Sequence, residues 1–133
     1  MDRQGESDHH NLILAKFLYL LRRKNVCVIF PEGGRSRSGR IEPENVQYGV
    51  GRMIQELGEC RVICIYQRGE KFKTLSVQPP GDDNYHIVLE AVHPRTDVQG
   101  YRGARDISRQ IINKLKEMED AWFASRPDRS SGK

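Results

Sequence analysis

The stretch Val26-Cys-Val-Ile-Phe-Pro-Glu-Gly-Gly-Arg-Ser-Arg-Ser-Gly-Arg40 is the part of the sequence that decides the expected fold. Its first five residues are apolar and three are β-branched, which predicts a short buried strand. Pro31 ends this strand because proline has no amide hydrogen for the ladder. Glycine, arginine and serine alternate in the remainder; glycine allows close backbone approach, and guanidinium groups suit phosphate oxygens. The stretch therefore predicts a strand that leads into an anion-binding loop.

Apolar residues at helical spacing predict a helix before this stretch and two helices after it. The first begins near an N-cap at Ser7 and packs through Ile13, Phe17, Leu20 and Leu21, with Leu14 and Leu18 widening the face. The second spans Val46 to Leu57 and is closed by Gly58; Gly49 and Gly51 inside it indicate a close approach. The third spans about 104–125, and its stripe is predicted to be core: Ile107, Ile111, Leu115, Met118 and Trp122.

Three further strands are predicted, at Arg61 to Tyr66, at Phe72 to Val77 and at His86 to Val92. Alternating helices and strands predict the α/β class, with a mixed sheet flanked by helices. We expect one domain over residues 1–124, followed by a disordered polar tail over 125–133.

Charge and composition limit the classes of partner. The 133 residues carry a net charge of +4 with a pI near 9.1, which favours an anionic partner. There is no run of eighteen apolar residues, so we expect no membrane-spanning segment and a cytoplasmic location. Cys27, Cys60 and Cys64 are expected to be reduced core residues of an intracellular protein, and no Cys/His set indicates a metal or another cofactor.

The segment Phe30-Pro-Glu-Gly-Gly-Arg-Ser-Arg-Ser-Gly39 resembles the Phe-Pro-Glu-Gly-Thr-Arg-Ser block of the glycerolipid acyltransferases, the lysophosphatidic acid acyltransferase family. Gly34 stands where that family usually has threonine. The start of the chain, with Arg3 ahead of Glu6-Ser-Asp8, resembles the end of the second block of the family. Val62 to Tyr66 resembles its fourth block, with Cys64 at the usual proline. With Gly49, the resemblance extends from residue 1 to about residue 116.

The resemblance implies an incomplete glycerol-3-phosphate acyltransferase-like domain. In that family an acyl group passes from acyl-CoA or acyl carrier protein to a lysophospholipid or glycerol-phosphate acceptor, in phospholipid biosynthesis. Peripheral contact with the cytoplasmic membrane face is also implied. The implied substrate-binding residues are Arg3, Glu32, Gly33, Gly34, Arg35 and Ser36. Two roles stay open for Glu32: it orients a loop donor or accepts an acceptor hydroxyl, or it forms a simple ion pair with a neighbouring arginine.

The catalytic block of that family, Asn-His-x4-Asp, is missing. None of the four histidines, His9, His10, His86 and His93, has an aspartate five residues later. No catalytic residue is therefore assigned, and we expect the chain alone to be inactive, since a general base contributes about 10²–10⁴-fold. Either a truncated reading frame, which we favour, or a degenerate homologue accounts for the missing block.

Two other functions follow from the same loop. A non-catalytic binding module for a phosphorylated headgroup or metabolite would keep the arginines without the histidine. RNA binding through Arg35 to Arg40 is a weaker alternative, because the run is short and has no interleaved aromatic residues. We therefore expect no nucleic-acid partner. A nucleotide P-loop is excluded because no Gly-Lys-Ser/Thr follows the glycines.

Overall fold

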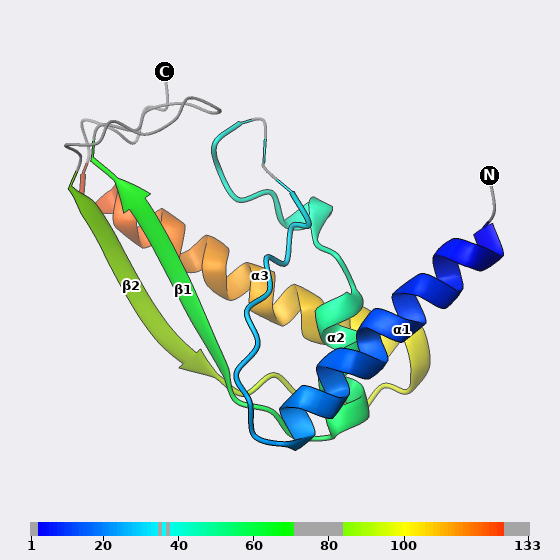
Figure 1. Cartoon of the computed structure of the whole chain (residues 1–133). Helices are drawn as coiled ribbons and strands as arrows, with labels where there is room; N and C mark the ends of the chain where they lie inside the picture. Colours follow the sequence, from blue (N-terminus) through cyan, green and yellow to red (C-terminus); the bar gives the residue numbers. More distant parts are fainter. Residues whose placement is uncertain (1–2, 35, 37, 71–83, 127–133) are drawn as a thin grey trace.

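The computed structural model describes residues 3–34, 36, 38–70 and 84–126, with the side chains of residues 3 and 4 excepted. Figure 1 shows the described elements in order. They are α1 (Arg3–Arg22), the short 3-10 helix η1 (Pro43–Asn45), α2 (Gly49–Leu57), β1 (Val62–Gly69), β2 (Tyr85–Val92) and α3 (Gly100–Ala124). Helices combined with a sheet confirm the α/β class. The predicted strand at Phe72 to Val77 and the tail over 127–133 lie outside the described residues.

β1 and β2 form an antiparallel pair in which Ile65 lies opposite Leu89. One face of this pair packs against α3 (Figure 1). The side chains of Cys64 and Tyr66 are buried on that face. The opposite face is exposed, with Ile65 at 54% and Leu89 at 60% of their accessible surface. The first of these strands is thus buried on one face only, and not throughout as predicted. The parallel pairing that a mixed sheet needs is not seen in the described residues.

α3 is the centre of the hydrophobic core. The predicted stripe is confirmed, because Ile107, Ile111, Met118 and Trp122 are buried and Leu115 packs against them. These side chains meet Ile54 from α2 and the inward side chains of β1. Burying one large apolar side chain contributes about 1.5–3 kcal/mol. The stripe therefore packs α2 and β1 against one helix.

A glycine sets the close contact between α2 and α3. The amide of Gly51 donates to the Ser108 hydroxyl at 3.0 Å, and a Cβ at Gly51 would collide with the Ala104 carbonyl oxygen. The close approach predicted at Gly51 is therefore confirmed. The close approach predicted at Gly49 is not found, because a Cβ at that position would meet nothing within 4 Å. α2 begins at Gly49 rather than Val46. It ends at Leu57, and Gly58 is its C-cap as predicted.

α1 begins earlier and packs less completely than predicted. It starts at Arg3, so Ser7 lies within the helix and is not its N-cap. Leu18 is the buried residue of its contact face, whereas Ile13 and Leu20, predicted to pack, are 39% and 41% exposed. The physical reason is that α1 contacts chiefly α2, a helix of nine residues, which covers little of a twenty-residue helix.

The predicted buried strand at Val26 to Phe30 is wrong. The segment forms no strand, and Val26, Val28 and Phe30 are 91%, 74% and 80% exposed. A fully buried strand needs a layer on each of its faces. In the described part of the chain the sheet consists of β1 and β2 alone, and neither pairs with this segment.

Within the described residues, no helix combines the length and the apolar character that a membrane span requires.

Candidate functional site

The loop after Phe30 starts with a tight turn that requires glycine. The amide of Gly33 donates to the Phe30 carbonyl at 3.0 Å, and Gly33 has a φ of +69°, in the left-handed region. The amide of Gln47 donates to the Pro31 carbonyl at 2.7 Å, which ties the turn to the chain just before α2. A Cβ at Gly33 would lie 2.8 Å from Cγ of Gln47, so space and dihedral angle both favour glycine.

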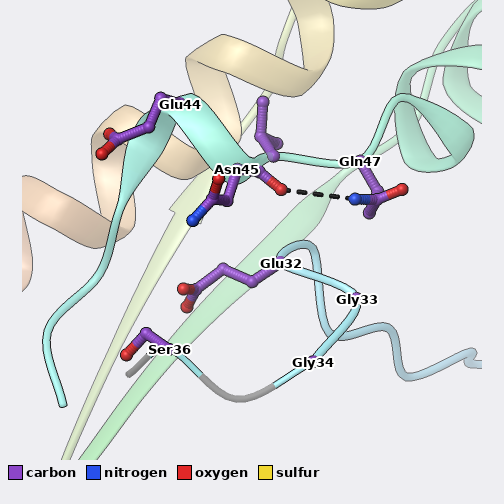
Figure 2. Close-up of a pocket in the computed structure, with 8 residues that line it drawn as sticks. Glu32, Gly33, Gly34, Ser36, Glu44, Asn45 and Gln47 are labelled. Atoms are coloured by element: carbon purple, nitrogen blue, oxygen red, sulfur yellow. Dashed lines mark hydrogen bonds between the residues drawn. The ribbon is translucent and has the colours of Figure 1, made fainter. Parts of the chain in front are cut away.

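The turn forms one wall of a hollow of about 400 Å³, which we call the glycine pocket. The side chains of Glu32 and Ser36 and the backbone of Gly33 and Gly34 line it, opposite the segment Glu44 to Gln47. Figure 2 shows the Glu32 side chain extending from the turn into the space between Ser36 and Asn45. Four of the six predicted site residues therefore lie together. The side chains of Arg3 and Arg35 lie outside the described part of the chain.

The charged side chains that line the glycine pocket, among described residues, are the carboxylates of Glu32 and Glu44. Burial raises the pKa of the Glu32 carboxyl; the backbone amide of Glu42 opposes this shift, and the carboxylates of Glu119 and Glu42 add to it. Within the described residues, no arginine forms an ion pair with Glu32. Among the described residues, the cations that an anionic ligand needs lie outside the lining of the glycine pocket.

Such cations line a second hollow, of about 310 Å³, which shares Glu32 and Ser36 with the first. We call it the arginine pocket. Its walls come from the loop, from the end of β1 and from α3 near its C-terminal end: Arg40, Tyr66, Arg68 and Glu119. Sequence reasoning placed Arg40 in the predicted anion-binding loop but missed Tyr66, Arg68 and Glu119 as members of a site. Strand alternation carried one usable signal, because Arg68 lies two residues beyond Tyr66 and shares its inward face.

Glu119 organises the arginine pocket. It is 1% exposed, and its Oε1 accepts from Arg40 Nε at 2.9 Å and from Lys116 Nζ at 3.1 Å. The backbone amide of Ile41 donates to both carboxylate oxygens, at 3.1 and 3.2 Å. The Tyr66 hydroxyl lies 3.4 Å from Oε2. One buried carboxylate therefore joins the loop, β1 and α3.

Arg68 is the most deeply buried cation of this pocket, at 9% exposed. Its Nη1 donates to the Gly39 carbonyl at 2.9 Å and lies 3.4 Å from the Tyr66 hydroxyl. Its Nη1 is 3.8 Å from Glu119 Oε2, which is longer than a hydrogen bond. Its Nε is buried and has no hydrogen-bond partner among the described residues. The Arg68 guanidinium is thus held in place with part of its donor capacity unused.

A histidine–carboxylate pair that the sequence did not reveal lies at the end of the hairpin. His86 Nε2 is 2.8 Å from Glu70 Oε1, and Arg126 Nη2 is 3.2 Å from His86 Nδ1. An imidazole that carries its proton on Nε2 donates to Glu70 and accepts from Arg126. Both ring nitrogens then have partners, so this histidine has no free lone pair with which to act as a general base.

The cysteines show no sign of nucleophilic chemistry. Burial raises the pKa of Cys64 and also that of Cys60, so the reactive thiolate is disfavoured at both. Of the three cysteines predicted to be core, Cys64 is buried, whereas Cys27 and Cys60 are only half-buried. Cys27 lies in the exposed segment from Val26 to Phe30, and Cys60 lies in the connection before β1. Neighbouring residues therefore cover each thiol only in part. Among the described residues, no three histidine, cysteine, aspartate or glutamate side chains cluster as metal ligands would.

Comparison with other proteins gives no relative for this chain: no family model, no curated protein and no solved structure matches it. The loop motif and the geometry of the two pockets are therefore the features that indicate a function.

Proposed function

We propose that this chain is the acceptor-binding part of an incomplete glycerol-3-phosphate acyltransferase-like domain. It binds a phosphorylated glycerol or a lysophospholipid headgroup and does not transfer an acyl group by itself. The observation that carries the proposal is the glycine turn, which puts the Glu32 carboxyl on a wall common to the glycine pocket and the arginine pocket. A phosphorylated polyol needs both environments, because it combines hydroxyl groups with an anion.

Each pocket suits one part of such an acceptor. Carboxylate and hydroxyl oxygens in the glycine pocket accept hydrogen bonds from glycerol hydroxyls; Glu32 and Ser36 supply them. Guanidinium groups in the arginine pocket donate charge-assisted hydrogen bonds to a phosphate. In this arrangement Glu32 acts on the acceptor hydroxyl, which is one of the two roles that its position in the sequence left open.

No pair of residues is assigned to the transfer step. The sequence contains no His-x4-Asp, and the nitrogens of His86 are both engaged. Acyl-CoA or acyl carrier protein would be the donor for the complete domain, working peripherally at the cytoplasmic face of the membrane in phospholipid biosynthesis. Without a base, transfer by this chain is expected to be slower by about 10²–10⁴-fold.

The second candidate is a non-catalytic binding module that holds a phosphorylated headgroup or metabolite and takes no part in acyl transfer. The same loop geometry supports it, since the turn and its tie to Gln47 are complete without any catalytic group. Selectivity separates the two functions. An acceptor site should prefer glycerol 3-phosphate over an unrelated phosphate monoester such as glucose 6-phosphate, whereas a general phosphate module should bind both alike.

Isothermal titration calorimetry of the full chain at low ionic strength tests the proposal, with glycerol 3-phosphate as ligand and glycerol as the uncharged control. We expect heat with the first and none with the second. No heat at millimolar glycerol 3-phosphate would contradict binding. A parallel assay with acyl-CoA and lysophosphatidic acid should give no transfer, and robust turnover by this chain would show that a base has been overlooked.

A further inference from the structure

The arginine pocket places two guanidinium groups on one aromatic ring. The Cζ atom of Arg40 lies 3.7 Å from the ring centroid of Phe123, and that of Arg68 lies 4.7 Å from the same centroid. Like charges repel when they are held this close, and an anion that contacts both relieves the repulsion. Glu119 does so in part, through its 2.9 Å contact with Arg40 Nε and its longer approach to Arg68.

The buried carboxylate does not use all the positive charge around it. Three cations, Arg40, Arg68 and Lys116, surround Glu119 and Asp120, and Glu32 is a further acid at the rim of the pocket. Asp120 is 57% exposed, so water screens its contribution, whereas Arg68 is almost fully enclosed. The positive charge inside the pocket is therefore concentrated on the buried guanidinium, which has no hydrogen bond to an acid among the described residues.

Hydrogen-bond donors are also left over. Each guanidinium has five N–H groups. Within the described residues Arg68 uses only Nη1, and Arg40 uses Nε and Nη2. The partnerless Nε of Arg68 belongs to a side chain that lines the hollow. The remaining N–H groups of the two guanidinium groups, which have no acceptor among the described residues, can donate to the oxygens of a bound anion.

We infer that the arginine pocket, through Arg40 and Arg68, is the site that holds the phosphate monoester of the ligand. The inference rests on the function proposed above and assigns the phosphate to residues outside the Phe-Pro-Glu-Gly motif. A phosphate monoester has three terminal oxygens, so it can take donors from both guanidinium groups at once. The hollow, at about 310 Å³, is large enough for a phosphate with a small attached polyol.

Glu32 is the acid at the rim of this pocket, and it does not oppose the assignment. Its raised pKa makes the carboxyl easier to protonate than an exposed glutamate. A protonated carboxyl donates a hydrogen bond to a phosphate oxygen instead of repelling it.

The test measures binding of inorganic phosphate, glycerol 3-phosphate and monomeric lysophosphatidic acid by calorimetry, with the full chain and three variants. Arg40→Gln removes the half-exposed guanidinium, and Arg68→Lys keeps the buried charge but loses the fork. Arg23→Gln is the matched control, because Arg23 also stacks on an aromatic ring, at 5.0 Å from the Tyr19 centroid, but is exposed in the turn after α1. Circular dichroism checks that each variant folds.

We expect Arg40→Gln and Arg68→Lys each to weaken phosphate binding by about 10-fold or more, and Arg23→Gln to change it by less than about twofold. If Arg68→Lys fails to fold, Arg40→Gln decides alone. A second readout needs no variant: the Nε–H resonance of Arg68 should shift when phosphate is added to the wild-type chain. Binding of the soluble phosphates as tightly as the lysolipid indicates a free metabolite, and a strong preference for the lysolipid indicates a headgroup.

The possible failures are distinguishable. Glycerol 3-phosphate that binds the wild type and both pocket variants equally would overturn the arginine pocket and leave the proposed function standing. Inorganic phosphate that binds through Arg40 and Arg68 without any binding of glycerol 3-phosphate would support the pocket and remove the proposed function. Absence of binding by all three ligands would overturn both.

Discussion

Arg40 and Glu119 are 79 residues apart in the sequence, yet Arg40 Nε lies 2.9 Å from Glu119 Oε1. Next to this contact, the amide of Ile41 donates to the same carboxylate. The two contacts fix the point at which the glycine-rich loop returns to the body of the protein. The loop therefore has two fixed ends, one at the glycine turn and the other at α3.

Replacing Glu119 should cost the chain a large share of its stability. Glu119→Gln removes a 1% exposed charge and leaves Arg40 and Arg68 without their buried counter-charge. Breaking a buried pair from one side costs about 3–5 kcal/mol. Urea unfolding followed by circular dichroism measures the change. The control is Glu117→Gln, two residues earlier on α3 and 70% exposed, which should stay within about 0.5 kcal/mol of the wild type. Equal effects for the two variants would show that the cluster has no structural role.

Two glycines in α2 should respond in opposite ways to the same substitution. Gly51→Ala forces a methyl group against the Ala104 carbonyl and pushes α2 away from α3, so a loss of about 1–3 kcal/mol is expected. Gly49→Ala meets open space and should be neutral or stabilising by up to about 1 kcal/mol. Thermal or urea unfolding of both variants checks the pair. If Gly51→Ala is as stable to unfolding as Gly49→Ala, the close contact between α2 and α3 at Gly51 is contradicted.

The glycine turn should be sensitive at one position and tolerant at the next. Gly33→Ala places a Cβ on a residue with φ of +69° and 2.8 Å from Gln47 Cγ, which costs about 1–2 kcal/mol in backbone energy alone. It should also weaken binding of glycerol 3-phosphate, because the turn positions Glu32. Gly34→Ala meets no atom within 4 Å and should leave stability unchanged. Calorimetry and unfolding of the same two proteins provide the comparison.

Stability should depend on pH through Glu32. Its pKa is raised by burial and by the carboxylates of Glu119 and Glu42, while Arg40 and Arg68 line the pocket that it borders. A carboxyl with a raised folded-state pKa contributes stability that is fully present below the unfolded value, near 4.5. That contribution is lost as the pH rises through the folded value.

Glu32→Gln removes this loss, so its stability relative to the wild type should be higher at pH 7 than at pH 4. Urea midpoints at the two pH values measure the difference. Glu44→Gln, which alters an exposed carboxylate of the glycine pocket, is the control. A gap between wild type and Glu32→Gln that does not change with pH would contradict the shift.

Periodicity predicted the elements that bury one clear face. α3 was predicted with its core stripe because a long helix repeats the same pattern through several turns. β2 was placed to within one residue at its start. β1 was ended too early, at Tyr66, because Gln67 and Arg68 are polar; their pairing with Ile87 and His86 continues the strand to Gly69. Apolar composition alone could not show that Val26, Val28 and Phe30 remain exposed in the described chain.

In the candidate site, residues that are neighbours in the sequence were predicted, and residues that only packing brings together were not. Glu32, Gly33, Gly34 and Ser36 were predicted together because they are neighbours in the sequence and belong to one motif. Arg68 and Glu119 come from a strand and a helix that meet only when α3 packs on β1. No local pattern identifies such a pair, although a charged residue inside an apolar stripe, as Glu119 is beside Met118, indicates a buried polar contact.

The exposed segment from Val26 to Phe30 has a consequence for handling the protein. Short extended runs of high β-propensity without charge are sites of amyloid-like aggregation when they are exposed. The residues on either side act as gatekeepers: three basic residues, Arg22 to Lys24, precede the run and Pro31 ends it. Solubility of this chain should consequently depend on those few positions, and Lys24→Ala or Pro31→Ala should lower the concentration at which it precipitates without changing its folded core.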